Sequence, residues 1–409
     1  MGGAAGHIKQ IWENHEFTFK ELKELIIKLL TNKIPNIFEK LDGINILITY
    51  KNNKILIARS TKHLKNFGID ALDFDNLKKY LNQRNTNECA KKAFIETVND
   101  FQNVFNKSKL NINNIFQEGK RWFNVEILYK ETENIIPYEK NQLRIHYIKE
   151  IDKEGKTICL IRDSEEFNAL ISEIRQIQLD LNNTFYIDKT NEVFIKEVDN
   201  NILTEFVKNL QNIRDSVDLK DTNTIEDYIE IKIKEFINQN IKISDEFLNL
   251  LSNRWAKNDK TVHINFLLKD QDEFVVNWVK TKDKIIKDKI DEILEPIVDL
   301  FCNFGIFILN NLEGVTTNDK NKSINKIKDK LNISIEYINK LNSIGDKFLL
   351  AYLKKIKRLG GLKTITPLEG IVFSYNDNLL KLTGCFTCIL RIIGFYMMER
   401  KTYKSLVDI

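Results

Sequence analysis

The sequence predicts an α+β fold in which two β-rich parts flank a long helical stretch. Residues 48–60 alternate apolar and polar side chains on either side of an Asn-Asn turn at 52–53, a pattern typical of a β-hairpin. Residues 368–384 repeat this pattern around a turn at 376–378. Between about 164 and 358, apolar residues recur every three or four positions, which predicts helices.

The first β-rich part contains further elements. Apolar spacing predicts helices at 18–32, with Thr18 as N-cap, and at 88–106. Alternation predicts strands at 122–130, 141–152 and 156–161, the last two joined by a turn. These strands are expected to pair in antiparallel hairpins.

The change in pattern along the chain divides it into three segments. Residues 1–162 and 359–409 are expected to form one β-rich domain, with its strands in a single sheet system. Residues 163–358 are expected to form a mainly helical insertion into that domain. A final apolar helix is predicted at 386–400.

Composition restricts the class of protein. The 409 residues include 62 Lys and Arg against 58 Asp and Glu, a net charge of +4 that permits a polyanionic partner without requiring one. The 5 cysteines are scattered, which favours a reducing compartment over a disulfide framework. No apolar run reaches the length of a membrane span and no signal peptide is visible. We therefore expect a cytoplasmic protein with no membrane partner, in the host cytoplasm if the protein is viral.

The stretch "EKLDGIN" (39–45) carries the first chemical signal. A lysine is a nucleophile only when its amine is neutral, and burial or a nearby cation would lower the pKa of Lys40 towards that state. The Asp42-Gly43 pair lets the backbone turn next to it. Asn45 falls on the same strand face as Gly43.

These residues resemble motif I, the K-x-(D/H)-G signature of the covalent nucleotidyltransferases, which include ATP-dependent DNA ligases, RNA ligases and capping enzymes. The glutamate before the lysine is most similar to phage-type RNA ligases. Further stretches resemble the other motifs of this superfamily in the family's order. They are "LIARS" with Arg59, "FNVEIL" with Glu126, "LRIHYIK" with His146 and Tyr147, "LEGIVF" with Glu369, and "LLKLTG" with Lys381.

The resemblance implies a reaction and a role for each residue. Lys40 would attack the α-phosphate of ATP to form a lysyl-AMP and release pyrophosphate, with Asp42 as a further catalytic residue of the motif. Glu369 would hold Mg²⁺, and Lys381 would neutralise the α-phosphate in the transition state. ATP and Mg²⁺ are therefore the expected cofactors.

The remaining residues are implied to bind the nucleotide. Glu39 would contact the adenine, and His146 or Tyr147 would stack on it. Glu126 would hold the ribose hydroxyls, and Gly43 would lie beside them in motif I. The implied phosphate ligands, for ATP or for the 5′-phosphate end of the substrate, are Asn45 and Arg59.

Two departures from the family pattern are visible. Motif V usually contains two lysines in K-x-K, whereas Leu379 and Thr383 flank Lys381 here. The short segment after Lys381 has no room for the C-terminal OB-fold of DNA ligases and capping enzymes, so the expected fold is an antiparallel-sheet nucleotidyltransferase domain with a helical insertion and no OB-fold.

The sequence leaves several functions open. The first is an ATP-dependent polynucleotide ligase with nucleic acid as partner, RNA in preference to DNA. A DNA nick sealer is a close relative of it. The alternatives are a non-catalytic protein that keeps the nucleotidyltransferase fold as a scaffold or nucleic-acid-binding module, and an enzyme that transfers AMP to a protein or small molecule.

Overall fold

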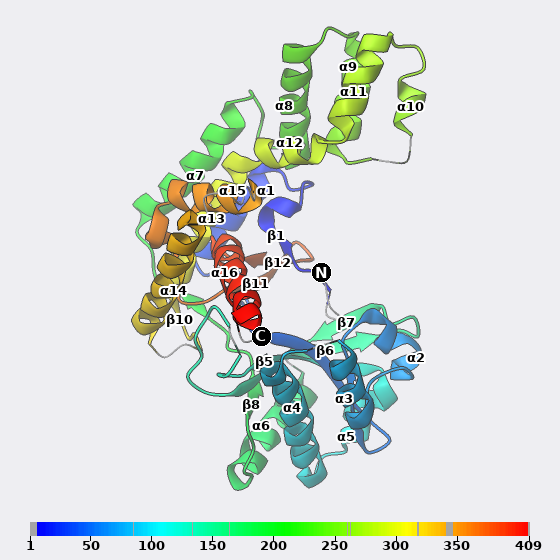
Figure 1. Ribbon diagram of the computed structural model, residues 1–409, viewed down its shortest axis with the longest axis vertical. Coiled ribbons are helices and arrows are strands. Elements are labelled where there is room, and N and C mark those ends of the chain that lie inside the picture. The colour runs from blue at the N-terminus through cyan, green and yellow to red at the C-terminus, as the bar shows by residue number, and fades with distance from the viewer. Residues whose placement is uncertain are drawn as a thin grey trace.

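The computed structural model has an elongated shape made of three parts. Figure 1 shows a sheet with its helices at one end, a helical lobe at the other, and a smaller sheet between them. The residues that it describes are 6–84, 86–132, 134–162, 164–259, 261, 263–316, 319–340 and 347–407. The N-terminal residues 1–5, which belong to the first predicted segment, lie outside this description.

The larger sheet has six strands, all from the first 189 residues. Its order is β4-β3-β5-β6-β7, and β8 pairs in parallel with β6. The other neighbours are antiparallel. The strands are β3 (Ile44–Lys51), β4 (Lys54–Ala58), β5 (Arg121–Leu128), β6 (Gln142–Ile151), β7 (Thr157–Ile161) and β8 (Tyr186–Lys189). The hairpins predicted for this part are confirmed, and Asn52 and Asn53 both have the positive φ that a two-residue hairpin turn needs.

Helices cover one face of this sheet. A cluster of phenylalanines, including Phe101 on a helix and Phe123 on β5, fills the space between them. The helices near this core are α2 (Lys65–Gly68), α3 (Phe74–Gln83), α4 (Glu88–Lys107), α5 (Ile112–Phe116) and α6 (Glu165–Ile177). Because side chains alternate along a strand, the residues between the core positions point to the opposite face, where the candidate site lies.

The smaller sheet joins the two ends of the chain. Its order is β1-β12-β11-β2, with β1 parallel to β12 and the other pairs antiparallel. The strands are β1 (Lys9–Gln10), β2 (Phe38–Lys40), β11 (Gly370–Tyr375) and β12 (Asn378–Leu382). The predicted C-terminal hairpin, β11–β12, is therefore confirmed.

The expectation of a single sheet system differs from the structure. Only β1 and β2 of the N-terminal part join the C-terminal hairpin, while β3–β8 form a separate sheet. The division falls between β2 and β3, so consecutive strands on either side of Asp42-Gly43 belong to different sheets. The fold is α+β, with two mixed sheets rather than one antiparallel sheet.

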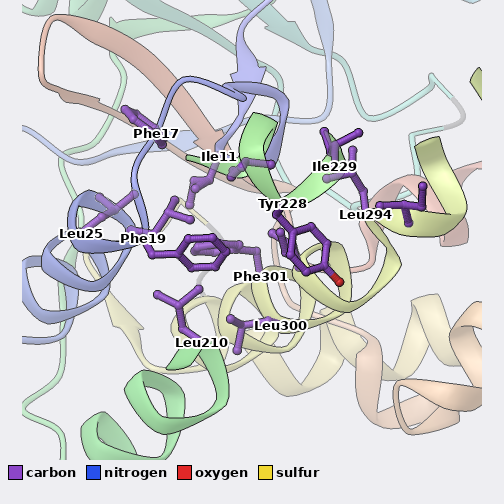
Figure 2. Close-up of a cluster of buried hydrophobic side chains, with 14 of the residues drawn as sticks. Ile11, Phe17, Phe19, Leu25, Leu210, Tyr228, Ile229, Leu294, Leu300 and Phe301 are labelled. Carbon is purple, nitrogen blue, oxygen red and sulfur yellow. The ribbon is translucent and has the colours of Figure 1, made fainter. Parts of the chain in front are cut away.

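The helical lobe and the smaller sheet share a second core. Phe19 of α1 packs there beside Leu210, Tyr228 and Phe301, which come from three helices of the lobe (Figure 2). The helices that contribute are α1 (Phe19–Leu30), α7 (Asn200–Asp215), α8 (Ile225–Asn240), α9 (Asp245–Ala256), α10 (Ile264–Leu267), α11 (Glu273–Asp283), α12 (Ile286–Ile293) and α13 (Glu295–Asn310). The Thr18 side chain caps α1 as predicted, by accepting a hydrogen bond from the Glu21 backbone N–H.

The remaining elements complete the chain. Helices α14 (Lys320–Lys340), α15 (Lys347–Arg358) and α16 (Phe386–Val407) share a third apolar cluster, and β9 (Phe194–Ile195) pairs with β10 (Leu312–Glu313). Short 3-10 turns are η1 (Ile11–Glu13), η2 (Thr61–Leu64), η3 (Gln117–Gly119), η4 (Gln178–Asp180) and η5 (Gly361–Thr364). Within the described part of the chain, no helix combines the length and the apolar character that a membrane span requires.

The beginning of the predicted helical insertion lies with the larger sheet. Helix α6 buries Phe167, Leu170 and Ile174 in the core of that sheet, and β8 extends the sheet. Helical spacing in the sequence identified α6 as a helix, but spacing alone does not say which core a helix covers. The helices that pack away from the larger sheet begin with α7.

We predict that the two main cores contribute similarly to stability. Truncation of a fully buried ring, Phe301→Ala in one core or Phe123→Ala in the other, should lower the free energy of unfolding by about 3–5 kcal/mol, because each leaves a cavity. Phe266→Ala removes a ring that is 74% exposed and should change it by less than about 0.5 kcal/mol. Urea denaturation measures all three, and a small loss for either buried ring would contradict the core assignment.

Candidate functional site

A cavity of about 560 Å³ lies between the two sheets. Strand β2 and the β11–β12 region line one side of it, and β3, β5 and β6 line the other. All the site residues singled out from the sequence line it, namely Glu39, Lys40, Asp42, Gly43, Asn45, Arg59, Glu126, His146, Tyr147, Glu369 and Lys381. The fold therefore brings together residues that are spread over most of the chain.

Lys40 and Glu369 form an ion pair at the centre of the smaller-sheet side. Lys40 ends β2 opposite Gly370 of β11, so the residue before Gly370 reaches the lysine side chain. The Lys40 Nζ and Glu369 Oε1 atoms are 2.5 Å apart, and the two side chains are 27% and 15% exposed. The antiparallel register of β2 and β11 thus fixes this pair.

The electrostatics at Lys40 differ from the expectation that burial would lower its pKa. Burial does lower the pKa of Lys40, but the carboxylates of Glu369, Glu126 and Asp42 raise it, and the net pKa is above its ordinary value. Burial raises the pKa of Glu369 to about 7, an effect that Lys40 opposes. Before any nucleotide binds, Lys40 is therefore a cation held by its acidic neighbours.

Asp42 holds a loop against the site. Its Oδ2 atom accepts hydrogen bonds from the backbone N–H groups of Ile135 and Ile136, at 2.7 and 2.9 Å. The Asp42 backbone N–H donates to the hydroxyl of Tyr138 at 2.9 Å. Burial raises the pKa of Asp42, although these backbone donors and Lys40 lower it. The carboxyl group that motif I supplies is therefore engaged in positioning residues 135–138.

Gly43 is required by close packing rather than by a turn. Its φ is not among the positive values found in this chain. A Cβ atom at this position would lie 2.6 Å from the backbone oxygen of Ile127 and 2.8 Å from a methyl carbon of Leu128, both on β5. The absence of a side chain lets the link between β2 and β3 lie directly against the larger sheet.

Glu126 is the hub of a polar cluster on the larger sheet. Its Oε1 atom accepts from the Gly43 backbone N–H at 3.1 Å, and its Oε2 atom accepts from the Asn45 side-chain amide at 3.0 Å. The Nε2 atom of His146 is 3.3 Å from the same Oε2. Asn45 and Glu126 stand opposite each other in the β3–β5 pairing, which explains their contact.

A β-bulge brings both His146 and Tyr147 to the cavity. Asn124 pairs with Tyr147 and Val125 with Ile145, so His146 is an extra residue on β6. Without this bulge, adjacent side chains of a strand would point to opposite faces. Both residues contact the cavity as predicted, and the Nδ1 atom of His146 lies 2.8 Å from the Thr190 hydroxyl.

The two predicted phosphate-binding cations differ in their surroundings. The Arg59 guanidinium donates to the backbone oxygen of Asn45 and lies 5.0 Å from the Phe94 ring centre, so protein groups hold it in place. Lys381, on β12, is half-buried and lies near Lys40. Burial lowers the pKa of Lys381, with a smaller lowering by Lys40 and an opposing effect of Glu13.

Glu39 has a buried carboxyl group with one unsatisfied oxygen. The side chain is 1% exposed, and Oε2 accepts from the Thr316 backbone N–H at 2.7 Å. Its Oε1 atom is buried without a hydrogen-bond partner in the described part of the structure. Burial raises the pKa of Glu39, partly offset by the bond from Thr316. A buried polar atom of this kind indicates a ligand contact.

Sequence reasoning missed three residues of the site. Asn124 lies two residues before Glu126 on the same strand face, and that alternation was the signal for it. The Arg162 guanidinium lies 4.8 Å from the Phe38 ring centre and 5.3 Å from that of Tyr147. Nothing in the sequence around Arg162 or Phe38 marked them, because their contacts join distant segments.

Comparison with known proteins adds no assignment. No family model matches the chain, and no curated protein matches it. Within the described ranges, no group of three or more His, Cys, Asp and Glu side chains is arranged to hold a metal ion.

We predict that Gly43→Ala will destabilise the protein by roughly 1–3 kcal/mol, because the new methyl group must displace β5 backbone. Gly394→Ala is the matched control. Gly394 lies in α16 with nothing within 4 Å of the added Cβ, so this change should be neutral or stabilising by up to about 1 kcal/mol. Thermal unfolding of both variants measures the difference, and equal stabilities would show that β2 and β5 do not pack this closely.

Proposed function

We propose that this chain is an ATP-dependent polynucleotide ligase that acts through a covalent lysyl-AMP at Lys40, on RNA in preference to DNA. The observation that supports it is the convergence of the candidate residues of all the motifs on one cavity between two sheets. The preference for RNA rests on the resemblance of "EKLDGIN" to phage-type RNA ligases.

The proposed reaction begins at the Lys40 amine. The neutral amine attacks the α-phosphorus of ATP, a P–N bond forms, and the bond to pyrophosphate breaks. Before this attack the lysine must lose the proton that its acidic neighbours hold on it. Glu369, 2.5 Å away and with a pKa of about 7, is the group positioned to receive that proton.

Glu369 also fits the Mg²⁺ that the resemblance implies. Mg²⁺ keeps several waters and binds through one or two carboxylates together with substrate phosphates, so a single carboxylate beside Lys40 suffices. When bound, Mg²⁺ would shield the charge of the phosphate oxygens. Lys381 would add a fixed positive charge on the same side of the cavity.

The free oxygen of Glu39 supports adenine as the base. With its raised pKa, a protonated Glu39 carboxyl group would donate one hydrogen bond and accept another. The adenine edge offers a ring-nitrogen acceptor beside an amine donor, whereas guanine offers the reverse order. A buried site built this way disfavours the wrong base because its polar groups are left unpaired.

The larger-sheet side of the cavity would hold the sugar and the face of the base. Glu126 presents carboxylate oxygens that already accept hydrogen bonds, and ribose hydroxyls are donors of the same kind. His146 and Tyr147 present aromatic rings beside it. These contacts would orient the α-phosphate towards Lys40.

We expect wild-type protein incubated with α-³²P-ATP and Mg²⁺ to retain label through denaturing electrophoresis. Lys40→Ala should retain none, because it lacks the amine that forms the P–N bond. Label from GTP should be weaker by about 10²-fold or more, since Glu39 would be mispaired.

Lys54→Ala is the matched control, because Lys54 is an exposed lysine at the start of β4 and does not line the cavity. It should label like the wild type. Folded wild-type protein that takes no label from ATP would overturn the proposal and favour a non-catalytic scaffold. Label that persists in Lys40→Ala would place the nucleophile elsewhere.

We also expect the labelling rate at saturating ATP to rise with pH, by up to tenfold per unit, because the Lys40 pKa is raised and only the neutral amine reacts. Below about pH 7 the decline should steepen, since protonated Glu369 neither accepts a proton nor binds a cation. Single-turnover labelling between about pH 6 and 9 measures this. A flat profile would exclude Lys40 deprotonation from the rate-limiting step.

A further inference from the structure

A second, larger cleft adjoins the nucleotide cavity. Its volume is about 1070 Å³, and it lies between the helical lobe, the N-terminal segment and the start of α16. Lys381 and His7 line both cavities, so the two meet there. A molecule in the cleft would thus have access to the phosphate side of the nucleotide cavity, beside Lys40.

The lobe side of the cleft is basic. Lys284 lies between α11 and α12 and Lys287 in the first turn of α12, both exposed, and neither has an ion pair within 4 Å in the described structure. Lys257, at the end of α9, adds a third ammonium group. Closely spaced exposed lysines along one wall are suited to the regularly spaced phosphates of a nucleic-acid strand.

The acidic groups of the cleft are partly neutralised by protein partners. Asp283 accepts a hydrogen bond from the Trp255 indole N–H at 2.8 Å. Glu295 pairs at 2.7 Å with Arg358, which does not line the cleft. The excess of unneutralised charge facing the cleft from the lobe is therefore positive.

The N-terminal wall offers groups for a base. Trp12, half-buried in η1, contributes an aromatic ring to the lining. Beside it, Gln10 is 6% exposed, and its Nε2 atom donates to the Thr383 hydroxyl at 2.7 Å. The Gln10 Oε1 atom is buried with no partner among the described residues. A stacking ring and an unsatisfied acceptor recognise an unpaired base, which offers both a flat face and amine donors.

We propose that this cleft binds a single-stranded polynucleotide, with its phosphates on Lys284 and Lys287 and a base on Trp12, and delivers its 5′-phosphate end to Lys381. A single strand is favoured over a duplex because stacking on Trp12 requires an unpaired base. The cleft is far larger than pyrophosphate alone needs. Delivery of the end rests on the proposed function, whereas binding of the strand does not.

The transfer that this arrangement would permit is balanced. A 5′-phosphate oxygen of the strand attacks the phosphorus of the lysyl-AMP, and a P–O bond forms as the P–N bond breaks. The Lys40 amine leaves and takes up a proton, and the strand carries AMP through a new pyrophosphate link. No electrons are exchanged and no other reactant is needed.

The test measures binding without ATP, so it is independent of adenylation. A fluorescein-labelled, 5′-phosphorylated RNA 12-mer is titrated with the full chain at several salt concentrations, and anisotropy gives the affinity. In the double variant Lys284→Glu/Lys287→Glu, affinity should fall at least tenfold and the salt slope by about 2, one for each lost phosphate contact. Trp12→Leu should weaken binding with the slope unchanged, because only stacking is lost.

The matched control is Lys269→Glu/Lys280→Glu, which reverses two exposed lysines of the same lobe that do not line the cleft. It should bind RNA like the wild type. Equal binding by the cleft variant and the wild type, or an equal loss in the control, would overturn the proposal. So would AMP transfer to a protein or small molecule by a chain that binds no RNA.

Covalent labelling with ATP is measured in parallel on the wild type. RNA binding that depends on Lys284 and Lys287 in a chain that takes no label would uphold the cleft and reject the ligase. Labelling without cleft-dependent binding would uphold adenylation and reject the cleft. The two hypotheses therefore fail separately.

Discussion

The pairing of β2 with β11 is the constraint on which the site depends. It sets Lys40 against Gly370, and with it the ion pair between Lys40 and Glu369, at the only place where three residues of the N-terminal part meet the C-terminal hairpin in this register. Directly after β2 the chain leaves this sheet and enters the other one at Ile44. The tight packing at Gly43 and the two backbone bonds to Asp42 fix that transition.

The buried charges around Lys40 are costly for stability. Removing an ammonium and several carboxyl groups from water is repaid only partly by their attraction, and such pairs are often no better than apolar side chains of the same size. The raised pKa values of Glu39, Asp42 and Glu369 express this cost. A cluster of this kind between two sheets is more readily explained by chemistry than by folding, because perturbed groups gathered in one cavity are typical of functional sites.

The parts of the fold that depend on local sequence could be predicted. The hairpin turns at Asn52-Asn53 and Asn376-Asp377 and the cap at Thr18 are set by neighbouring residues, and each lies where its pattern indicated. The separation into two sheets was not predicted, because alternation marks strands but does not say which strands pair.

The site was predictable to a similar extent. The order of short motifs identified the residues of the cavity, but not the way they contact each other. The bulge at His146 depends on a pairing with β5 that no local pattern reveals. The same holds for the contacts of Asp42 with Ile135 and of Arg162 with Phe38, which join segments far apart in sequence. The direction of the Lys40 pKa shift also needed the structure, since it depends on which carboxylates surround the amine.

The position of the cavity between two sheets has a thermodynamic consequence. The sheets belong to different hydrophobic cores, and one short link between β2 and β3 connects them at the cavity. A ligand that contacts both walls loses its binding site as soon as either core unfolds. Its binding free energy is therefore shared by both cores, and each multiple of its dissociation constant added in solution strengthens their cooperativity as well as their stability.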